Sequence, residues 1–251
     1  KKRLVGWVGD DLADIIPCAY ADADYAGCEK TMRSTTGASL IMQSLLTRFL
    51  IAGRSIKQGC VSNSTPEAEM VACHFCYKHI IIPTFPLWDA ILPPNWRVKF
   101  YEDNQAMIRV VQTGRNPTMK TLKRCHGVDL LFLHERLSDS RGDSVHETNH
   151  NRDPVDMEYT ESDKMAADIF TKAFTNADKW EAALKLINII DGDCIPAHIQ
   201  SVIDAVRTKM ESKAEEETQP QEAPAIHVRT SVACTYSQSM EHSSTVPKFG
   251  R

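Results

Sequence analysis

The sequence predicts an α/β domain built around one sheet. Three β-leaning runs follow one another at 16–22, 37–43 and 46–57, with links so short that neighbouring strands must be antiparallel. A capped helix comes next, and two further strands then alternate with helical segments. Strands and helices mixed in this order are typical of a single sheet covered by helices.

Caps and apolar spacing mark the elements that follow the three strands. The first helix begins at Ser64 or Thr65 with Pro66 in its first turn, and we expect Pro83 to end it. Strands are then predicted at 97–102 and 155–160, helices at 104–113, 121–137 and 162–174, and an exposed loop at 138–153.

Composition divides the chain into three parts. Residues 1–175 contain the predicted sheet, and residues 176–208 contain two stretches with amphipathic helical spacing. From 209 to 251 the chain is charged, carries prolines and is rich in Ser and Thr without an apolar period. Such a composition predicts a disordered tail.

Composition also limits the possible functions. Apolar residues make up 42% of the 251 residues, and the net charge of −4 provides no overall basic field for nucleic acid, so such a contact requires local patches. The eight cysteines lack the spacing of a disulfide framework, and neither a secretion signal nor a membrane-length apolar run is present. We therefore expect a soluble intracellular protein with free thiols, and interpret the start at Lys1 as part of a longer polypeptide.

Four acidic residues occupy positions that invite a metal. Asp22 and Asp103 close predicted strands, whereas Glu69 and Asp168 lie on the apolar stripes of predicted helices. An acid on a core-facing stripe is unfavourable unless it is paired or bound to a cation. Convergence of the four at one edge of the sheet would create a metal site.

Each acid also has a purely structural interpretation. Asp22 alone is compatible with a turn, and Asp103 with the N-cap of the following helix. Glu69 could favour a helix N-terminus, and Asp168 could lie on a solvated helix face. These interpretations explain the acids singly but not their combined placement.

The acids lie in four ordered blocks. These are YADADYAGCEKTMRSTTG at 20–37, SNSTPEAEMVA at 62–72, YEDNQAMI at 101–108 and MAADIFTKAF at 165–174. The first resembles the Asp-Ala-Asp-x-Ala-Gly…Arg-Ser-Thr-x-Gly block of the ribonuclease H domain of copia-type retrotransposon Pol polyproteins. The others resemble, in order, that family's Ser-Ser-Thr-Glu-Ala-Glu-Tyr-x-Ala, Asp-Asn-Gln-Ala-Ala-Ile and Leu-Ala-Asp-Ile-Leu-Thr-Lys-Pro-Leu. Pro66, Ala173, an extra residue after His126 and the long 138–153 loop depart from the family pattern without touching the acids.

The resemblance implies an RNase H-like fold, a five-stranded mixed sheet flanked by helices, that cuts the RNA strand of RNA–DNA hybrids. It implies that Asp22, Glu69, Asp103 and Asp168 are both the catalytic residues and the metal ligands. Two Mg²⁺ ions, replaceable by Mn²⁺, would be the cofactors, with Asp22 shared, Glu69 and Asp103 on one ion and Asp168 on the other. The expected partners are the hybrid and the reverse transcriptase part of the same polyprotein.

A basic cluster precedes the second half of the predicted 121–137 helix. It consists of Lys120, Lys123, Arg124 and His126. Such a cluster usually forms a solvated basic face, but here these side chains could contact the phosphates of the hybrid. His126 could alternatively pack or cap.

Other interpretations remain open from the sequence. Cys73 and Cys76 suggest zinc, but no second pair stands at finger spacing, and their place in a packed helix favours a core role. A catalytically inactive nucleic-acid-binding or scaffold module is the main alternative function, because a fold does not fix an activity. A nuclease of the same fold that acts on DNA is a further alternative.

Overall fold

The computed structural model describes the chain up to residue 208 with several gaps, and the sheet and its covering helices lie within that part. Lys120, most of the loop predicted at 138–153, and the tail predicted at 209–251 fall outside the described residues. The described residues are 1–116, 119, 122–138, 152–194, 197, 199–201, 203–204 and 207–208.

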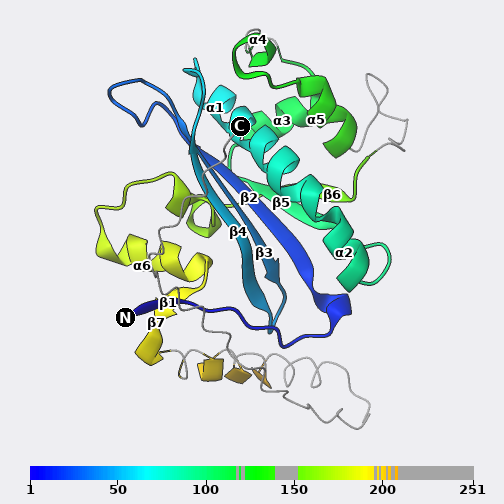
Figure 1. The fold of residues 1–251 in the computed structure, drawn as a ribbon, viewed down its shortest axis with the longest axis vertical. Helices are drawn as coiled ribbons and strands as arrows, with labels where there is room; N and C mark the ends of the chain where they lie inside the picture. The colour runs from blue at the N-terminus through cyan, green and yellow to red at the C-terminus, as the bar shows by residue number, and fades with distance from the viewer. Residues whose placement is uncertain are drawn as a thin grey trace, which may run out of the picture.

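A five-stranded mixed sheet stands at the centre of the fold and confirms the predicted fold class (Figure 1). Its strands are β2 (Ile16–Asp24), β3 (Thr35–Gln43), β4 (Arg48–Lys57), β5 (Val98–Glu102) and β6 (Val155–Tyr159), in the order β4-β3-β2-β5-β6. β2, β3 and β4 form the predicted antiparallel meander, whereas β5 runs parallel to β2 and β6 parallel to β5. Because β2, β5 and β6 are parallel, their carboxyl ends meet at the same edge of the sheet.

Helices cover one face of the sheet and enclose the main core (Figure 1). These are α1 (Thr65–Cys76), α2 (Phe85–Ile91), α3 (Gln105–Thr113) and α5 (Leu130–Leu137). Leu40 and Phe100 of the sheet and Trp88, Met107 and Leu133 of the helices are completely buried there. None of the helices in the described part of the chain has the length and apolar content needed to span a membrane.

The first helical segment does not end at Pro83, contrary to the prediction. After α1 the chain continues through a π-helical turn at Tyr77–Ile81 and a 3-10 turn at Ile82–Thr84 into α2. Pro83 lies in the first turn of the 3-10 segment, where its missing N–H is not needed. The buried Tyr77, Ile80 and Ile81 keep this segment on the core, so packing overrides the local break.

The helix predicted at 121–137 is two helices, which corrects that prediction. Gly127 has a φ of +68°, a left-handed conformation that ends α4 (Leu122–His126) and suits glycine. Asp129 then caps α5, its side chain accepting a hydrogen bond from the Leu131 N–H at 3.1 Å. The helical spacing of apolar residues in this segment therefore belongs to two short helices that follow one another, not to one continuous helix.

The second face of the sheet is covered by the segment after β6. A continuous helix predicted at 162–174 is wrong, because the structure has only 3-10 turns there, at Ser162–Lys164 and Asp168–Phe170. Between the turns, Met165 is extended with φ −73° and ψ 96°, which lets Met165, Ala166 and Ala167 all be buried. Burial of successive residues overrides the helical propensity of the segment, because a helix would turn some of them away.

Later residues join the same second face. The buried cluster there contains Cys18, Tyr20 and Ile41 from the sheet, and also Ile187, which follows α6 (Ala177–Leu186). A two-stranded sheet pairs β1 (Lys2–Leu4) with β7 (Ile189–Asp191) in antiparallel register. α6 confirms the first helical stretch predicted within 176–208, and much of the second lies outside the described residues.

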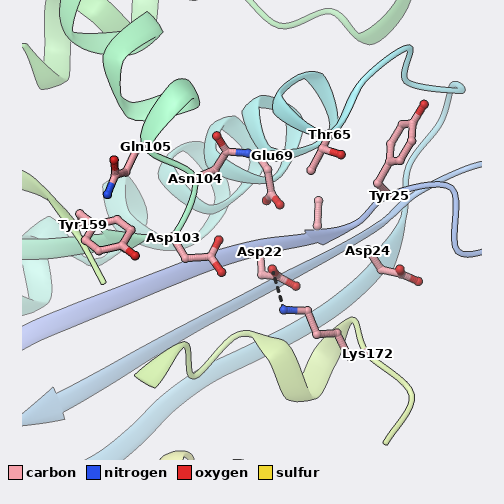
Figure 2. Close-up of a pocket in the computed structure, with 11 residues that line it drawn as sticks. Asp22, Asp24, Tyr25, Thr65, Glu69, Asp103, Asn104, Gln105, Tyr159 and Lys172 are labelled. Atoms are coloured by element: carbon pink, nitrogen blue, oxygen red, sulfur yellow. Dashed lines mark ion pairs between the residues drawn. The ribbon is translucent and has the colours of Figure 1, made fainter. Parts of the chain in front are cut away.

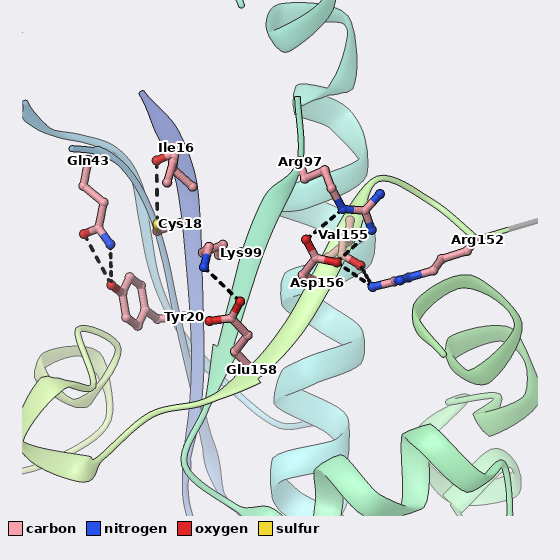
Figure 3. A network of polar contacts seen from close by, with 10 residues as sticks. All are labelled: Ile16, Cys18, Tyr20, Gln43, Arg97, Lys99, Arg152, Val155, Asp156 and Glu158. Atoms are coloured by element: carbon pink, nitrogen blue, oxygen red, sulfur yellow. Dashed lines mark hydrogen bonds and ion pairs between the residues drawn. The ribbon is translucent and has the colours of Figure 1, made fainter. Parts of the chain in front are cut away.

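Paired charges link β5 and β6 on the second face (Figure 3). The Arg97 guanidinium donates to both carboxylate oxygens of Asp156, at 2.7 and 2.8 Å, and the Lys99 ammonium donates to Glu158 at 3.0 Å. Partly exposed pairs of this kind contribute little energy each. Their cross-strand placement instead favours the observed register of β6, the edge strand.

Candidate metal centre

Asp22 lies two residues before the end of the central strand and is only 2% exposed. Its register partner on β3 is Gly37, and a side chain there would collide with Thr171 and with the Ala167 carbonyl. The segment around Thr171 therefore approaches the sheet closely beside Asp22. The Thr171 hydroxyl uses this approach to donate a hydrogen bond to Asp22 Oδ2.

Glu69 reaches the same place from α1. Ser64 caps the helix by accepting a hydrogen bond from the Glu67 N–H at 3.3 Å, and Glu67 Oε2 accepts one from the Asn63 N–H at 2.9 Å. This reciprocal cap fixes the first turn and points Glu69, in the next turn, toward the sheet. Glu69 is 4% exposed, and its buried Oε2 has no hydrogen-bond partner among the described residues.

Asp103 follows β5 directly and points into the same cleft (Figure 2). It is not the N-cap of α3, because Asn104 occupies that position and accepts a hydrogen bond from the Met107 N–H at 3.0 Å. Asp103 Oδ2 instead accepts a hydrogen bond from the Ser162 hydroxyl at 2.7 Å, so the loop after β6 orients this carboxylate.

Three of the four predicted acids come together. Asp22, Glu69 and Asp103 each offer a carboxylate oxygen, and these oxygens all lie within 4.8 Å of one another. Burial raises the pKa of Glu69, and the carboxylates of Asp22 and Asp103 raise it further. Burial also raises the pKa of Asp22, although Lys172 and Thr171 counteract it. Three crowded carboxylates in this setting are unfavourable without a cation.

Asp168 lies beside this group and contacts it through a lysine. The Lys172 ammonium is 2.6 Å from Asp168 Oδ1 and 3.5 Å from Asp22 Oδ1 (Figure 2 shows the contact with Asp22). Burial raises the pKa of Asp168 to about 6, with Lys172 opposing the shift and Asp22 and Asp103 adding to it. The solvated-face interpretation of Asp168 is therefore wrong, since its side chain is only 14% exposed.

The donor set fits a hard divalent cation. All candidate ligand atoms are carboxylate oxygens, which Mg²⁺ and Mn²⁺ prefer over sulfur or imidazole. The unpartnered Oε2 of Glu69 is the kind of buried atom that a bound cation would satisfy. By contrast, Cys73 and Cys76 are fully buried in the main core and belong to no metal-capable group among the described residues.

An open cleft of about 610 Å³ is lined by Asp22, Glu69 and Asp103. Figure 2 shows Tyr25 and Thr65 toward one end and Gln105 and Tyr159 toward the other. Tyr25 and Tyr159 are 41% and 49% exposed. An extended ligand could therefore cross the acids and meet neutral hydrogen-bonding groups on both sides.

The predicted basic cluster separates into exposed and buried members. The Lys123 side chain is 75% exposed and forms an ion pair with Asp129 at 2.5 Å, and Arg124 is exposed. The His126 imidazole is almost completely buried, with Nε2 3.5 Å from Glu67 Oε1. His126 thus packs α4 against the first turn of α1, which is the packing alternative for this residue.

Several side chains at the site escaped the sequence analysis. Ser162, Thr171 and Lys172 were not singled out, because their contacts depend on the fold of the segment that was predicted as a helix. Glu102 was also missed, although it is completely buried beside Asp103, and burial raises its pKa well above the usual range. The alternation of RVKFYE could have placed Glu102 on the buried face of its strand.

Comparison with known proteins gives one structural likeness. No protein-family model matches the chain. Among solved structures, the chain is similar to LC11-RNase H1, isolated from compost by a metagenomic approach, with 15% sequence identity and a TM-score of 0.40. The match covers 62% of this chain and 92% of that chain. Sheet topology and acid geometry, rather than this likeness, support the function proposed below.

Proposed function

We propose that this chain is a metal-dependent endonuclease of the RNase H type, which hydrolyses the RNA strand of RNA–DNA hybrids. The observation that carries the proposal is the convergence of the buried Asp22 and Glu69 with Asp103 in an open cleft. Buried like charges at this spacing are unfavourable alone, and a divalent cation would remove the penalty. The arrangement therefore favours metal-dependent chemistry over a purely structural role for the acids.

The four acids would divide between two ions. Asp22 would be the shared ligand, because it lies close to Glu69 and Asp103 and is linked to Asp168 through Lys172. Glu69 and Asp103 would then hold one ion and Asp168 the other. When bound, two Mg²⁺ ions, or Mn²⁺ in their place, would activate a water and stabilise the charge that develops on the scissile phosphate.

The chain's own task is to hold these carboxylates in position. Ser162 donates to Asp103, and Thr171 donates to Asp22, so each carboxylate keeps one oxygen oriented by a hydroxyl. Second-layer hydrogen bonds of this kind fix ligand geometry before a metal arrives. Both hydroxyls come from the segment that follows β6.

Substrate recognition would rest on neutral and basic side chains around the acids. Tyr25, Thr65, Gln105 and Tyr159 line the cleft, and such groups can contact the ribose 2′-hydroxyls that distinguish RNA from DNA. The exposed Lys123 and Arg124 of α4 would contact hybrid phosphates. The buried contact between His126 and Glu67 supports this role, because it places α4 against the end of α1 that lines the cleft.

The four sequence blocks support a specific context for this activity. We propose that the chain derives from the Pol polyprotein of a copia-type retrotransposon, where it would act during reverse transcription. Its partner would then be the reverse transcriptase part of the same polyprotein, which makes the hybrid.

A cleavage assay tests the proposal. The purified chain is incubated with an RNA–DNA hybrid labelled on the RNA strand, with Mg²⁺, Mn²⁺ or EDTA, beside Asp22→Asn and Glu69→Gln variants. We expect cleavage of the RNA by the wild type alone and only with a divalent ion. Cleavage that survives EDTA, or equal cutting of double-stranded DNA, contradicts the proposal. Hybrid binding without cleavage would identify the catalytically inactive module instead.

A further inference from the structure

Lys172 occupies a position that the proposed reaction does not explain. Its ammonium group lies between Asp22 Oδ1 and Asp168 Oδ1, at 3.5 and 2.6 Å. Within the described part of the chain, Lys172 is the partner in every ion pair that the four site acids form. A single positive charge is thus placed between the two carboxylates that would share an ion.

Neighbouring residues of one segment engage both oxygens of Asp22. Thr171 donates to Oδ2, while the Lys172 ammonium approaches Oδ1. A divalent ion held by both Asp22 and Asp168 would have to approach the Lys172 ammonium, and like charges at such short distance repel each other. The Thr171 hydroxyl can stay, because a carboxylate oxygen that accepts one hydrogen bond still has a lone pair for an ion. The Lys172 contact therefore has to give way before Asp22 can act as the shared ligand.

Lys172 is the contact that is able to move. The backbone beside it is fixed, because the Ser55 hydroxyl donates to the Phe170 carbonyl at 2.6 Å and Gly37 packs against Thr171 and Ala167. The Lys172 side chain, in contrast, is 39% exposed at the wall of the cleft. A lysine ammonium on its flexible four-carbon stem can leave such a position without any change in the backbone.

We infer that Lys172 is a tethered counter-ion of the acid cluster, which holds Asp22 and Asp168 together in the metal-free protein and is displaced when a divalent ion binds these carboxylates. This inference rests on the proposed metal-dependent function. It makes two claims about the chain itself. Lys172 stabilises the fold without metal, and it competes with the ion on the Asp168 side, so that this ion binds more weakly than the site acids alone would allow.

Lys172→Met tests both claims, because methionine keeps most of the side-chain length and removes the charge. Lys164→Met is the matched control, since Lys164 comes from the same segment, is 66% exposed and forms its ion pair with Glu161, outside the acid cluster. Lys172→Arg keeps the charge and should behave like the wild type. Melting is measured in EDTA, and Mg²⁺ and Mn²⁺ binding is measured by calorimetry on the complete chain without nucleic acid.

We expect Lys172→Met to melt at a lower temperature than the wild type in EDTA, and to bind the weaker divalent ion about tenfold more tightly, the effect of removing one nearby charge. The control and Lys172→Arg should show neither change. Unchanged melting in EDTA together with unchanged ion affinity, or weaker ion binding by Lys172→Met, would overturn the inference. A wild type that binds no divalent ion would instead contradict the proposed function, whereas an altered melting temperature in EDTA would still reveal the counter-ion contact.

Discussion

Asp103 and Asn104 are neighbours in the chain, but their side chains have separate partners. Asn104 Oδ1 caps α3 by accepting from the Met107 N–H, whereas Asp103 Oδ2 faces the cleft and accepts from the Ser162 hydroxyl. The sequence alone could not separate a capping aspartate from a metal-binding one at this position. Because the cap belongs to Asn104, the two roles can be tested independently.

Asp103→Asn should abolish activity and leave the fold intact. The change removes a negative ligand while keeping the shape of the side chain, and we expect hybrid cleavage to fall by about 100-fold or more. Removing one of several crowded negative charges should leave the melting temperature in EDTA unchanged or raise it. Cleavage and melting are measured side by side on the variant and the wild type.

Asn104→Ala is the matched control for that experiment. Loss of the cap should destabilise the protein by about 1 kcal/mol, measured by urea unfolding, because the N–H of Met107 loses its partner. Retained activity in Asp103→Asn would show that Asp103 is not a ligand.

The stability of the metal-free protein should depend on the ionisation of Asp168. Its pKa rises to about 6 in the folded protein from 3.8, so the folded state holds the proton more tightly than the unfolded state. The stability contributed by this proton is complete below about pH 4 and is lost as the pH rises through about 6. Asp168→Asn should therefore gain stability relative to the wild type across this range.

Melting temperatures in EDTA between pH 4 and 7.5 measure this difference. Asp163→Asn, an exposed neighbour, serves as the control and should follow the wild type at every pH. A constant difference between Asp168→Asn and the wild type would contradict the assigned shift. Mg²⁺ should oppose the loss, because it stabilises the ionised carboxylate.

Arg124→Gln and Lys123→Gln should weaken hybrid binding without affecting melting. Both side chains are exposed. Each lost phosphate contact should reduce, by about one, the slope of the logarithm of the dissociation constant plotted against the logarithm of the salt concentration. Arg124 should have the larger effect, since Lys123 is already paired with Asp129. Fluorescence anisotropy at several salt concentrations measures both effects.

Lys179→Gln on α6 is the charge-matched control, because Lys179 is exposed and lies outside the cleft lining. An equal loss of affinity in this variant would mean that general charge, rather than α4, accounts for binding.

Trp88→Ala should destabilise the whole domain. Trp88 is completely buried in the main core, and its Nε1–H donates to Thr84 Oγ1 at 2.9 Å. Truncation of such a side chain costs about 3–5 kcal/mol. Trp180→Ala is the control, since Trp180 is 41% exposed, and should cost much less. Equal losses in urea unfolding would show that the core assignment is wrong.

Local pattern was sufficient for the strands and for the start of α1. Short links between β-leaning runs predicted the antiparallel meander, and alternation predicted β5, because the side chains of a strand alternate whatever surrounds it. The five-stranded mixed sheet was implied by the family resemblance. The Ser64 cap was equally readable, since its hydrogen bonds lie within four residues. The acid positions also followed, because Asp22 lies near the end of β2, Asp103 directly follows β5 and Glu69 stands on an apolar stripe.

Tertiary structure decided what those acids touch. The segment after β6 is not a helix, because burying Met165, Ala166 and Ala167 together is worth more than its local helical preference. The resulting conformation brings Ser162 into contact with Asp103, and Thr171 and Lys172 into contact with Asp22. The residues in each contact are 59 or more positions apart in the chain. Contacts over such separations leave no periodic signal in the sequence, so the sequence by itself determined which residues carry the charge, and only the packed chain determined which partners hold them.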